Sequence, residues 1–337
     1  MADPVLLSIA EAEDLTLRAF LACGVRVEQA KPTAAALVAA ERDGQKGHGL
    51  SRVSSYCAQV RAGKVKGDAE PKIRKVSNSA CIVDAGHGFA YPAIDHGVDV
   101  LRGLAKSEAI AMAAITRSHH FGQAGAHVEK LAEAGLVAFL FGNSPAAMAY
   151  WGGSRPMMGT NPIAFAAPLP DEPPLVIDLA LSVVARGRIV AAAKSGETIP
   201  DHWAFDAEGK STTDPHAALE GSMAPMGDAK GAALALMVEV MAAAITGSNF
   251  GFEASSFLND QGPPPDVGAV LIAIDPLMFS GETYYQQMAV LAAAIRNEPG
   301  ARMSGVRRLE RRHVADKNGL SVPRPIYEEL QTLAGAR

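Results

Sequence analysis

The 337-residue chain is poor in cysteine and lacks the spacings that bind zinc or form a disulfide framework. Cys23, Cys57 and Cys81 are odd in number and include no C-x-x-C pair. The first residues, Met-Ala-Asp-Pro, lack the basic residues of a secretory signal, and no apolar stretch of signal length follows them. These absences favour a cytoplasmic protein in a reducing compartment.

The chain also lacks a strong excess of charge and a long apolar run. A net charge of −5, without a basic stripe, argues against nucleic acid as the main partner. The longest apolar run, 232–246, contains Glu239 and is shorter than the roughly 20 residues that a bilayer requires. We therefore expect no membrane partner, and we expect this run to form a core helix.

Nucleotide and metal signatures are missing as well. No G-x-G-x-x-G follows a predicted strand and no G-x-x-x-x-G-K-[ST] loop is found, so neither the usual dinucleotide fold nor a P-loop is supported. The adjacent His119 and His120 point in different directions on an extended segment, and the other histidines show no H-E-x-x-H spacing. We predict no metal site.

What the chain contains is typical of a soluble α/β protein. It is 48% hydrophobic and 20% charged, and alanine-rich runs alternate with short β-branched runs. Ser8 with Glu11 predicts a capped helix, and the first forty residues predict two helices broken near Gly24. From Ile110 onward, apolar segments at 110–116 and 136–141 flank a short amphipathic segment, which predicts a strand, a helix and a strand.

The length favours two domains. We predict a mainly helical substrate and dimer domain from residues 1–115 plus 281–337, and an α/β cofactor-binding domain from residues 116–280. The boundaries rest on the change of pattern near Ile115 and the return to helix near Gly281.

The most informative stretch is Asp43–Arg52, which follows a predicted helix and places His48 between glycines and four residues before Arg52. An imidazole can give or take a proton near neutral pH, and a guanidinium can bind a carboxylate by two parallel hydrogen bonds. The alternative is a glycine-rich turn with a surface histidine, since Gly, Ser and Asp are ordinary turn residues.

Two other positions could meet the same small anion, and a third is a candidate nucleotide contact. His120 lies in the glycine loop 117–125 after a predicted strand, where open α/β sheets place ligands. Lys230 precedes a predicted helix whose backbone N–H groups favour an anion. Asp178 ends a predicted buried strand and is either a nucleotide contact or a helix cap.

Taken together, these motifs resemble the malate/L-lactate dehydrogenase family that lacks the usual Rossmann fold, which includes sulfolactate dehydrogenases and the Δ1-pyrroline-2-carboxylate/Δ1-piperideine-2-carboxylate reductases. The matching residues are Gly44 with His48-Gly49 and Arg52, Ser118 to Gly122, Gly159 to Pro162, Val176 to Ala180, Ala185 to Gly187, Thr212 to Pro215, Gly227 with Lys230-Gly231, and Ile274 to Pro276.

The resemblance implies a non-Rossmann α/β domain for a nicotinamide cofactor, in a homodimer that acts on a small carboxylate substrate. His48 would be the proton donor in reduction, Arg52 would bind the substrate carboxylate, and His120 would face the reaction centre. The basic tail 302–308 would contribute to cofactor binding, and an arginine there would favour NADPH over NADH. The implied cofactor-binding residues are Phe121, Gly122, Gln123, Ala124, Gly125, Thr160, Asp178, Leu179, Ala180, Lys230, Gly231 and Arg307.

The chain departs from the family pattern at one position. Gly47 stands where family members commonly have serine before the catalytic histidine. If that hydroxyl orients the imidazole or relays a proton, Lys46, water or nothing replaces it here.

The resemblance leaves the substrate open between a cyclic imino acid and a 2-oxo acid, because each offers an electrophilic C2 beside a carboxylate. The segment 248–253 resembles the imine-reductase and sulfolactate branches, and no further obvious arginine awaits a second carboxylate. We therefore expect reduction of Δ1-pyrroline-2-carboxylate, and of its six-membered homologue, to L-proline or L-pipecolate. The alternatives are an NAD(P)-dependent 2-hydroxy acid dehydrogenase for sulfolactate, malate or lactate, and a non-catalytic small-anion-binding protein.

Overall fold

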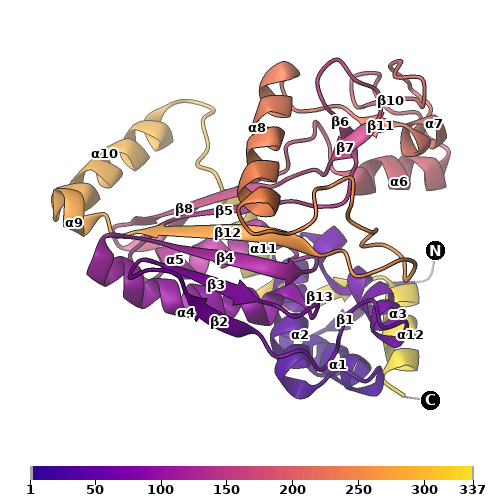
Figure 1. Ribbon diagram of the computed structural model, residues 1–337, viewed down its shortest axis with the longest axis horizontal. Coiled ribbons are helices and arrows are strands. Elements are labelled where there is room, and N and C mark those ends of the chain that lie inside the picture. The colour runs from indigo at the N-terminus through magenta and orange to yellow at the C-terminus, as the bar shows by residue number, and fades with distance from the viewer. Residues whose placement is uncertain (1–2, 336–337) are drawn as a thin grey trace.

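The computed structural model describes residues 3–335 and has a mixed sheet at its centre (Figure 1). The seven strands, in spatial order, are β2 (Lys72–Lys75), β3 (Ala80–Asp84), β4 (Ile110–Ser118), β12 (Val267–Ile274), β5 (Val137–Gly142), β8 (Ile163–Leu169) and β9 (Glu172–Leu179). Only β3 and β4 pair in parallel; the other neighbours are antiparallel. The prediction of an α/β fold other than the usual dinucleotide fold is confirmed.

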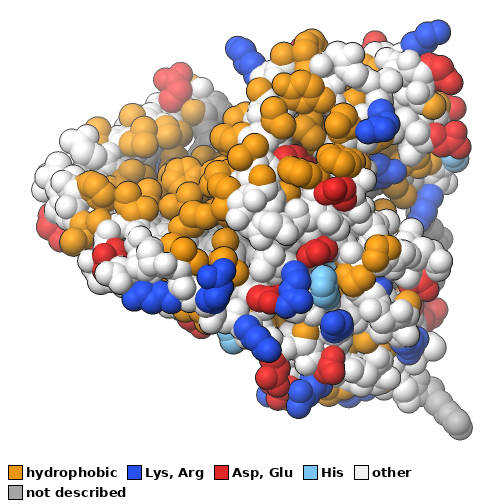
Figure 2. All heavy atoms as spheres, viewed as in Figure 1, with side chains coloured by type: hydrophobic (Ala, Val, Ile, Leu, Met, Phe, Trp, Pro, Cys, Tyr) orange, Lys and Arg blue, Asp and Glu red, His pale blue; other side chains and the backbone are white. Residues whose placement is uncertain are grey.

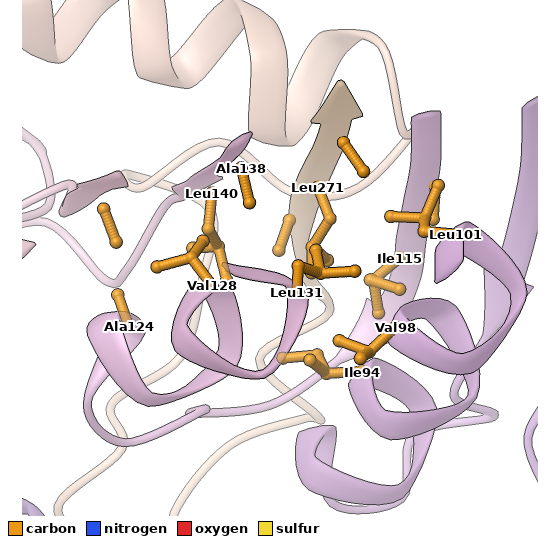
Figure 3. Close-up of a cluster of buried hydrophobic side chains, with 14 of the residues drawn as sticks. Ile94, Val98, Leu101, Ile115, Ala124, Val128, Leu131, Ala138, Leu140 and Leu271 are labelled. Atoms are coloured by element: carbon orange, nitrogen blue, oxygen red, sulfur yellow. The ribbon is translucent and has the colours of Figure 1, made fainter. Parts of the chain in front are cut away.

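Two helices, α4 (Ala90–Glu108) and α5 (Ala124–Ala132), cover one face of this sheet. Their apolar sides pack on alternate residues of the strands because side chains along a strand alternate between its two faces. The resulting cluster, shown in Figure 3, includes Ile94, Val98, Leu131, Leu140 and Leu271, all fully buried. The predicted strand, helix and strand after Ile110 are confirmed, but β12 inserts between β4 and β5.

A second core joins the two ends of the chain. Helices α1 (Ile9–Ala22), α2 (Val27–Arg42) and α3 (Val53–Arg61) pack with α12 (Arg324–Leu333), and β1 (Val5–Leu7) pairs with β13 (Leu320–Val322). The capping box is confirmed, because the Ser8 side chain accepts from the Glu11 backbone and the Glu11 carboxylate accepts from the Ser8 backbone.

A small third core lies at the upper right of Figure 1. Its sheet contains β10 (Ala204–Phe205), β11 (Ser222–Met223), β6 (Met148–Ala149) and β7 (Pro156–Met158), and its helices are α6 (Arg186–Ser195), α7 (Pro215–Glu220) and α8 (Ala229–Glu239). A π-helical segment, Val240–Ala244, continues α8.

The expectation that 232–246 forms a core helix is only half correct. This helix buries Ala235, Val238 and Ala242, but Leu236 is 46% exposed and Val240 is 48% exposed. The reason is that the helix is apolar all around, so that one packed side leaves an apolar side uncovered. Among residues 3–335, no helix combines the length and hydropathy that a bilayer crossing requires.

After β12 the chain forms α9 (Leu277–Ser280), α10 (Thr283–Asn297) and α11 (Val306–Asn318), and α11 contacts α2. The predicted domain boundary between residues 115 and 116 falls inside β4, whose neighbour β12 comes from the other predicted domain. The sheet therefore contains strands from both predicted parts, and the division into domains stays a prediction.

Candidate active site

The two histidines singled out from the sequence lie together. His48 ends a short 3-10 turn, Lys46–His48, and His120 follows β4. The His48 Nδ1 atom lies 3.2 Å from the His120 Nε2 atom, and the rings stack with centroids 5.2 Å apart. The glycine-rich stretch is thus more than a surface turn, because it carries His48 into contact with a residue 72 positions away.

Arg52 ends a second 3-10 turn, Leu50–Arg52, which continues into α3. Its Nε atom donates to the Gly47 carbonyl at 2.6 Å, so the side chain folds back over the turn that holds His48. Burial and the Arg52 charge lower the pKa of His48 to about 4. His48 is therefore neutral at pH 7, beside a fixed positive charge.

Two buried tyrosines extend this pair. The Tyr56 hydroxyl lies 2.5 Å from His120 Nδ1 and 3.2 Å from the Tyr91 hydroxyl. Burial holds the pKa of His120 well below its usual value and raises the pKa of Tyr56 to about 12. Sequence reasoning missed both tyrosines. Tyr56 follows Arg52 by four residues, a helical spacing that could have indicated it, whereas nothing in the sequence indicates Tyr91.

One wall of the site is a loop that a buried lysine fixes. The Lys64 ammonium donates to the carbonyls of Ser256, Asn259 and Gln261 at 2.7, 3.0 and 2.7 Å. This loop presents Phe257 to the ring of His120, with centroids 5.3 Å apart. Three carbonyl partners allow a buried ammonium to stay charged, and the aromatic wall keeps that side of His120 apolar.

The segment after His120 has mainly structural side-chain contacts. Phe121 and Ala124 are buried in the sheet core, and Gln123 donates to Asp43 at 2.8 Å. Gly122 has a φ of 71°, and a Cβ there would lie 2.8 Å from the Tyr91 hydroxyl, so only glycine fits. The predicted cofactor contacts of these residues can therefore involve the backbone more than the side chains.

Asp178 at the end of β9 caps α5, since it accepts a hydrogen bond from the Gly125 N–H at 2.7 Å. The helix-cap alternative is thus observed, and the same residue also lines a surface cleft. Next to it, Leu179 is 45% exposed and Ala180 is half-buried. Thr160 lies close by in the fold, because its carbonyl accepts from Leu181 N–H at 2.8 Å.

Lys230 and Gly231 lie in the first turn of α8, in the third core. The Lys230 side chain is exposed. Gly231 is buried, and a Cβ there would lie 1.9 Å from the Met226 carbonyl, so close packing requires this glycine. Their role toward a cofactor stays a prediction.

The arginines of the C-terminal tail fall into two groups. Arg308 and Arg312 on α11 are paired with two buried carboxylates, Asp43 and Glu129, at 2.7 to 3.3 Å. Burial raises the pKa of both carboxyls, but hydrogen bonds from the arginines outweigh it and hold the pKa values below their usual range. Arg308, inside the tail predicted to bind cofactor, is thus engaged in an internal ion cluster.

The other group faces a cleft of about 270 Å³ between α11, the end of β9 and residues 43–45. Arg302, Arg307 and Arg311 line it, together with Asp178. Arg311 also passes over Gly44, where a Cβ would lie 2.5 Å from its Cδ atom. Within the described part of the chain, these three arginines have no carboxylate partner, so their charges are directed at the cleft.

A sequence profile described as malate/L-lactate dehydrogenase matches residues 7–331. The chain belongs to the malate/L-lactate dehydrogenase family.

Relatives within this malate/L-lactate dehydrogenase family match over nearly the whole chain. A (2R)-3-sulfolactate dehydrogenase (NADP(+)) of Chromohalobacter salexigens is 50% identical, over 98% of this chain and 99% of the relative. A Δ1-pyrroline-2-carboxylate reductase of Ancylobacter novellus is 38% identical, over 99% and 98%. The crystal structure of Δ1-piperideine-2-carboxylate reductase from Pseudomonas syringae matches with a TM-score of 0.93 at 36% identity, covering 98% and 99%.

This member of the family is an NAD(P)-dependent oxidoreductase. The cleft fits the anionic part of such a cofactor, because three guanidinium groups without carboxylate partners suit phosphate oxygens.

Proposed function

We propose that the chain catalyses NADP(H)-dependent oxidation and reduction at C2 of a small carboxylate, with His48 as the proton donor in reduction and Arg52 as the carboxylate ligand. The observation that carries this proposal is the contact of His48 with His120 beside Arg52. A hydride acceptor needs a positive group at its carboxylate and a proton for the heteroatom on C2.

Each residue has a distinct task in this proposal. Arg52 holds the carboxylate and so fixes the distance between C2 and the hydride donor, which the nicotinamide supplies when bound. His48 Nδ1 faces His120, so Nε2 is the nitrogen left to serve the substrate. Phe257 and Tyr56 surround His120 with apolar or neutral groups, which keeps solvent from competing for the proton.

The first substrate pair to test is sulfolactate and sulfopyruvate, since the 50% identical relative carries that name. This order differs from the expectation drawn from the sequence, in which the cyclic imine came first. The imine remains the second candidate, because pyrroline-2-carboxylate reductases are 38% identical. In addition, Arg52 is the one arginine within residues 3–335 whose charge lowers the pKa of both imidazoles. A single guanidinium suffices for a mono-anionic imino acid.

Parallel assays separate these candidates. NADPH and NADH oxidation would be followed with sulfopyruvate, pyrroline-2-carboxylate, piperideine-2-carboxylate and oxaloacetate. We expect the highest kcat/KM with sulfopyruvate. Turnover of the imines alone would reverse the order, and no turnover of any candidate, with NADPH still binding, would favour the non-catalytic anion-binding alternative.

We also propose NADPH as the preferred cofactor. Arg302, Arg307 and Arg311 offer positive charge for a 2′-phosphate that NADH lacks. Two acidic residues, Asp43 and Asp178, line the same cleft. Asp43 is paired with Arg308 and Arg312, and the Asp178 Oδ2 atom accepts from the Gly125 N–H. Titration of the two cofactors, followed by nicotinamide fluorescence, tests this preference, and equal affinities would contradict it.

A homodimer is the proposed assembly. The sheet face opposite α4 and α5 carries half-buried apolar side chains, among them Phe139, Phe165 and Ile272. Figure 2 shows apolar atoms gathered over this face, between α10 and α8. On α10, Val290 is 65% exposed. A contiguous apolar surface of this kind marks an interface, and symmetric pairing of two copies covers it on both.

Light scattering on the purified protein tests the dimer. We expect a mass of two chains, and Val290→Asp should shift the mass toward one chain because it places a charge in the interface. The control is Val314→Asp, which is 55% exposed on α11, a helix that contacts α2. A wild-type protein with the mass of one chain would contradict the proposal.

A further inference from the structure

Because His48 is neutral at pH 7, the proton that it gives to the substrate must be replaced from another group. An imidazole that is neutral at pH 7 can give up its Nε2 proton only if another proton enters at Nδ1. The atom that faces His48 Nδ1 is His120 Nε2, and His120 is itself followed by Tyr56 and Tyr91. The source of that second proton is therefore this buried row of hydrogen-bonded side chains, His120, Tyr56 and Tyr91.

Two arrangements of protons let all three hydrogen bonds between these four neutral groups run in one direction. In the first, Tyr91 donates to Tyr56, Tyr56 donates to His120 Nδ1, and His120 Nε2–H donates to His48 Nδ1, which leaves the proton of His48 on Nε2. In the second, every hydrogen bond runs the other way, and the Tyr91 hydroxyl must find an acceptor elsewhere.

The surroundings of Tyr91 favour the first arrangement. Its side chain is fully buried, and within residues 3–335 its hydroxyl has no hydrogen-bond partner other than Tyr56. Gly122 closes over the hydroxyl, since a Cβ there would lie 2.8 Å away. The second arrangement would leave a buried donor unsatisfied, which costs more than a hydrogen bond contributes when it is made.

We propose that Tyr56 and Tyr91 are positioning residues that fix the protons of His120 and His48, so that neutral His48 presents an Nε2–H group to the substrate and His120 with Tyr56 replaces the proton that it gives away. This inference extends the proposed function. The tyrosines touch neither substrate nor cofactor, and they act through the two histidines.

Every proton that a reductive step requires can be supplied along this row of hydrogen-bonded side chains. The hydride of NAD(P)H forms the new C–H bond at C2, and the C2 heteroatom takes the Nε2 proton of His48. His48 Nδ1 then takes the proton of His120 Nε2, and His120 Nδ1 takes the hydroxyl proton of Tyr56. The Tyr56 phenolate accepts from Tyr91 and faces the Arg52 charge, and solvent restores its proton through His48 once the product has left.

The charged and titratable groups around the chain agree with a neutral resting state. Arg52 acts on His48, His120 and Tyr56, and His48 and His119 act on His120. Among residues 3–335, no carboxylate is a cause of the pKa shifts of these three groups. His119 is held neutral by burial and bonds to Gln59 at 2.8 Å. Burial and Arg52 hold the pKa of both chain histidines low, so protonated His48 is scarce at neutral pH.

The kinetic test is the pH dependence of kcat/KM for reduction, measured between pH 6 and pH 9 by the NADPH assay. The wild type should be nearly flat, because neutral His48 is the active form. Tyr56→Phe removes the donor to His120, so His48 must work as the imidazolium. Its kcat/KM should fall about tenfold per pH unit, and so by about a thousandfold between pH 6 and pH 9, the range over which the wild type stays flat.

The matched control is Tyr327→Phe, which deletes a tyrosine hydroxyl bonded to Gln331 at 2.6 Å on the edge of the same helical core. It should leave the pH profile unchanged. A wild type that already falls tenfold per unit, or a Tyr56→Phe variant that stays flat, would overturn the inference.

A second measurement needs neither activity nor a folded variant of Tyr56. Nitrogen NMR of the ligand-free protein, labelled with ¹⁵N-histidine and assigned by the His120→Gln spectrum, reports which ring nitrogen carries the proton. We expect Nε2–H on both His48 and His120. Nδ1–H on His120 would overturn the inference even if the protein turned over every candidate substrate, whereas Nε2–H with no turnover would leave the inference standing and count against the proposed function.

Discussion

Two polar regions meet at residues 43–52, one around His48 and one around Asp43. The first contains neutral buried groups, and the second contains charged buried groups. The first region is the row of hydrogen-bonded side chains His48, His120, Tyr56 and Tyr91. It is buried among aromatic rings, which keeps each of its groups neutral. The region around Asp43 buries full charges and compensates them by pairing, while three unpaired arginines remain at its surface. The first region is suited to moving a proton, and the second to holding an anion.

Removal of the proposed proton donor should have the largest effect on activity. His48→Ala should lower kcat by about a thousandfold, since general acid catalysis contributes about 10² to 10⁴. Binding of NADPH should stay within about twofold because the arginine cleft is untouched. His202→Ala, whose side chain is 67% exposed, serves as the control for histidine loss. Unchanged turnover would exclude His48 from the chemistry.

Disruption of the buried ion cluster should lower the stability of the fold. Arg312→Met should lower the free energy of unfolding by about 3 kcal/mol, because it leaves Asp43 and Glu129 with one arginine between them. Urea denaturation followed by circular dichroism measures the change. Arg18→Met, which breaks an exposed pair with Asp14, should cost less than about 0.5 kcal/mol. Equal changes in the free energy of unfolding would mean that burial does not make the Arg312 ion pairs more stabilising than the exposed Arg18–Asp14 pair.

An unpaired arginine of the same helix should affect cofactor choice and leave stability unchanged. Arg311→Met should weaken NADPH binding about tenfold, the loss of one charge-assisted hydrogen bond, and should leave NADH binding nearly unchanged. Fluorescence titration with both cofactors measures this. A parallel loss for both would place Arg311 at a part of the cofactor that they share.

The smallest effect is expected at Gly47. Its backbone is outside the left-handed region and its Cβ position is open, so Gly47→Ser is accommodated without strain. We expect less than about a threefold change in kcat, because His120 already engages Nδ1 of His48 and Tyr56 in turn engages Nδ1 of His120. A gain of ten times or more would show that the serine of other family members supplies a relay that this chain lacks.

Residues that are close together in the sequence were enough to predict several helices, strands and motifs. The periodicity of apolar residues predicted α1, α2, β4 and β5, and the capping box at Ser8 marked the first helix. Ordered motifs predicted the family, because each motif depends on residue types a few positions apart. The resemblance to that family implied the candidate roles of His48 and Arg52 and a basic tail for the cofactor.

The tertiary structure alone decided which of these groups meet. Tyr56 bonds to His120 across 64 positions, and Arg312 bonds to Asp43 across 269, and no local pattern encodes either contact. Folding also divided the arginines of α11 into paired and unpaired ones, according to which side of the helix faces α2 and α5. Burial then set the protonation of each group, since the cost of removing a charge from water depends on everything packed around it.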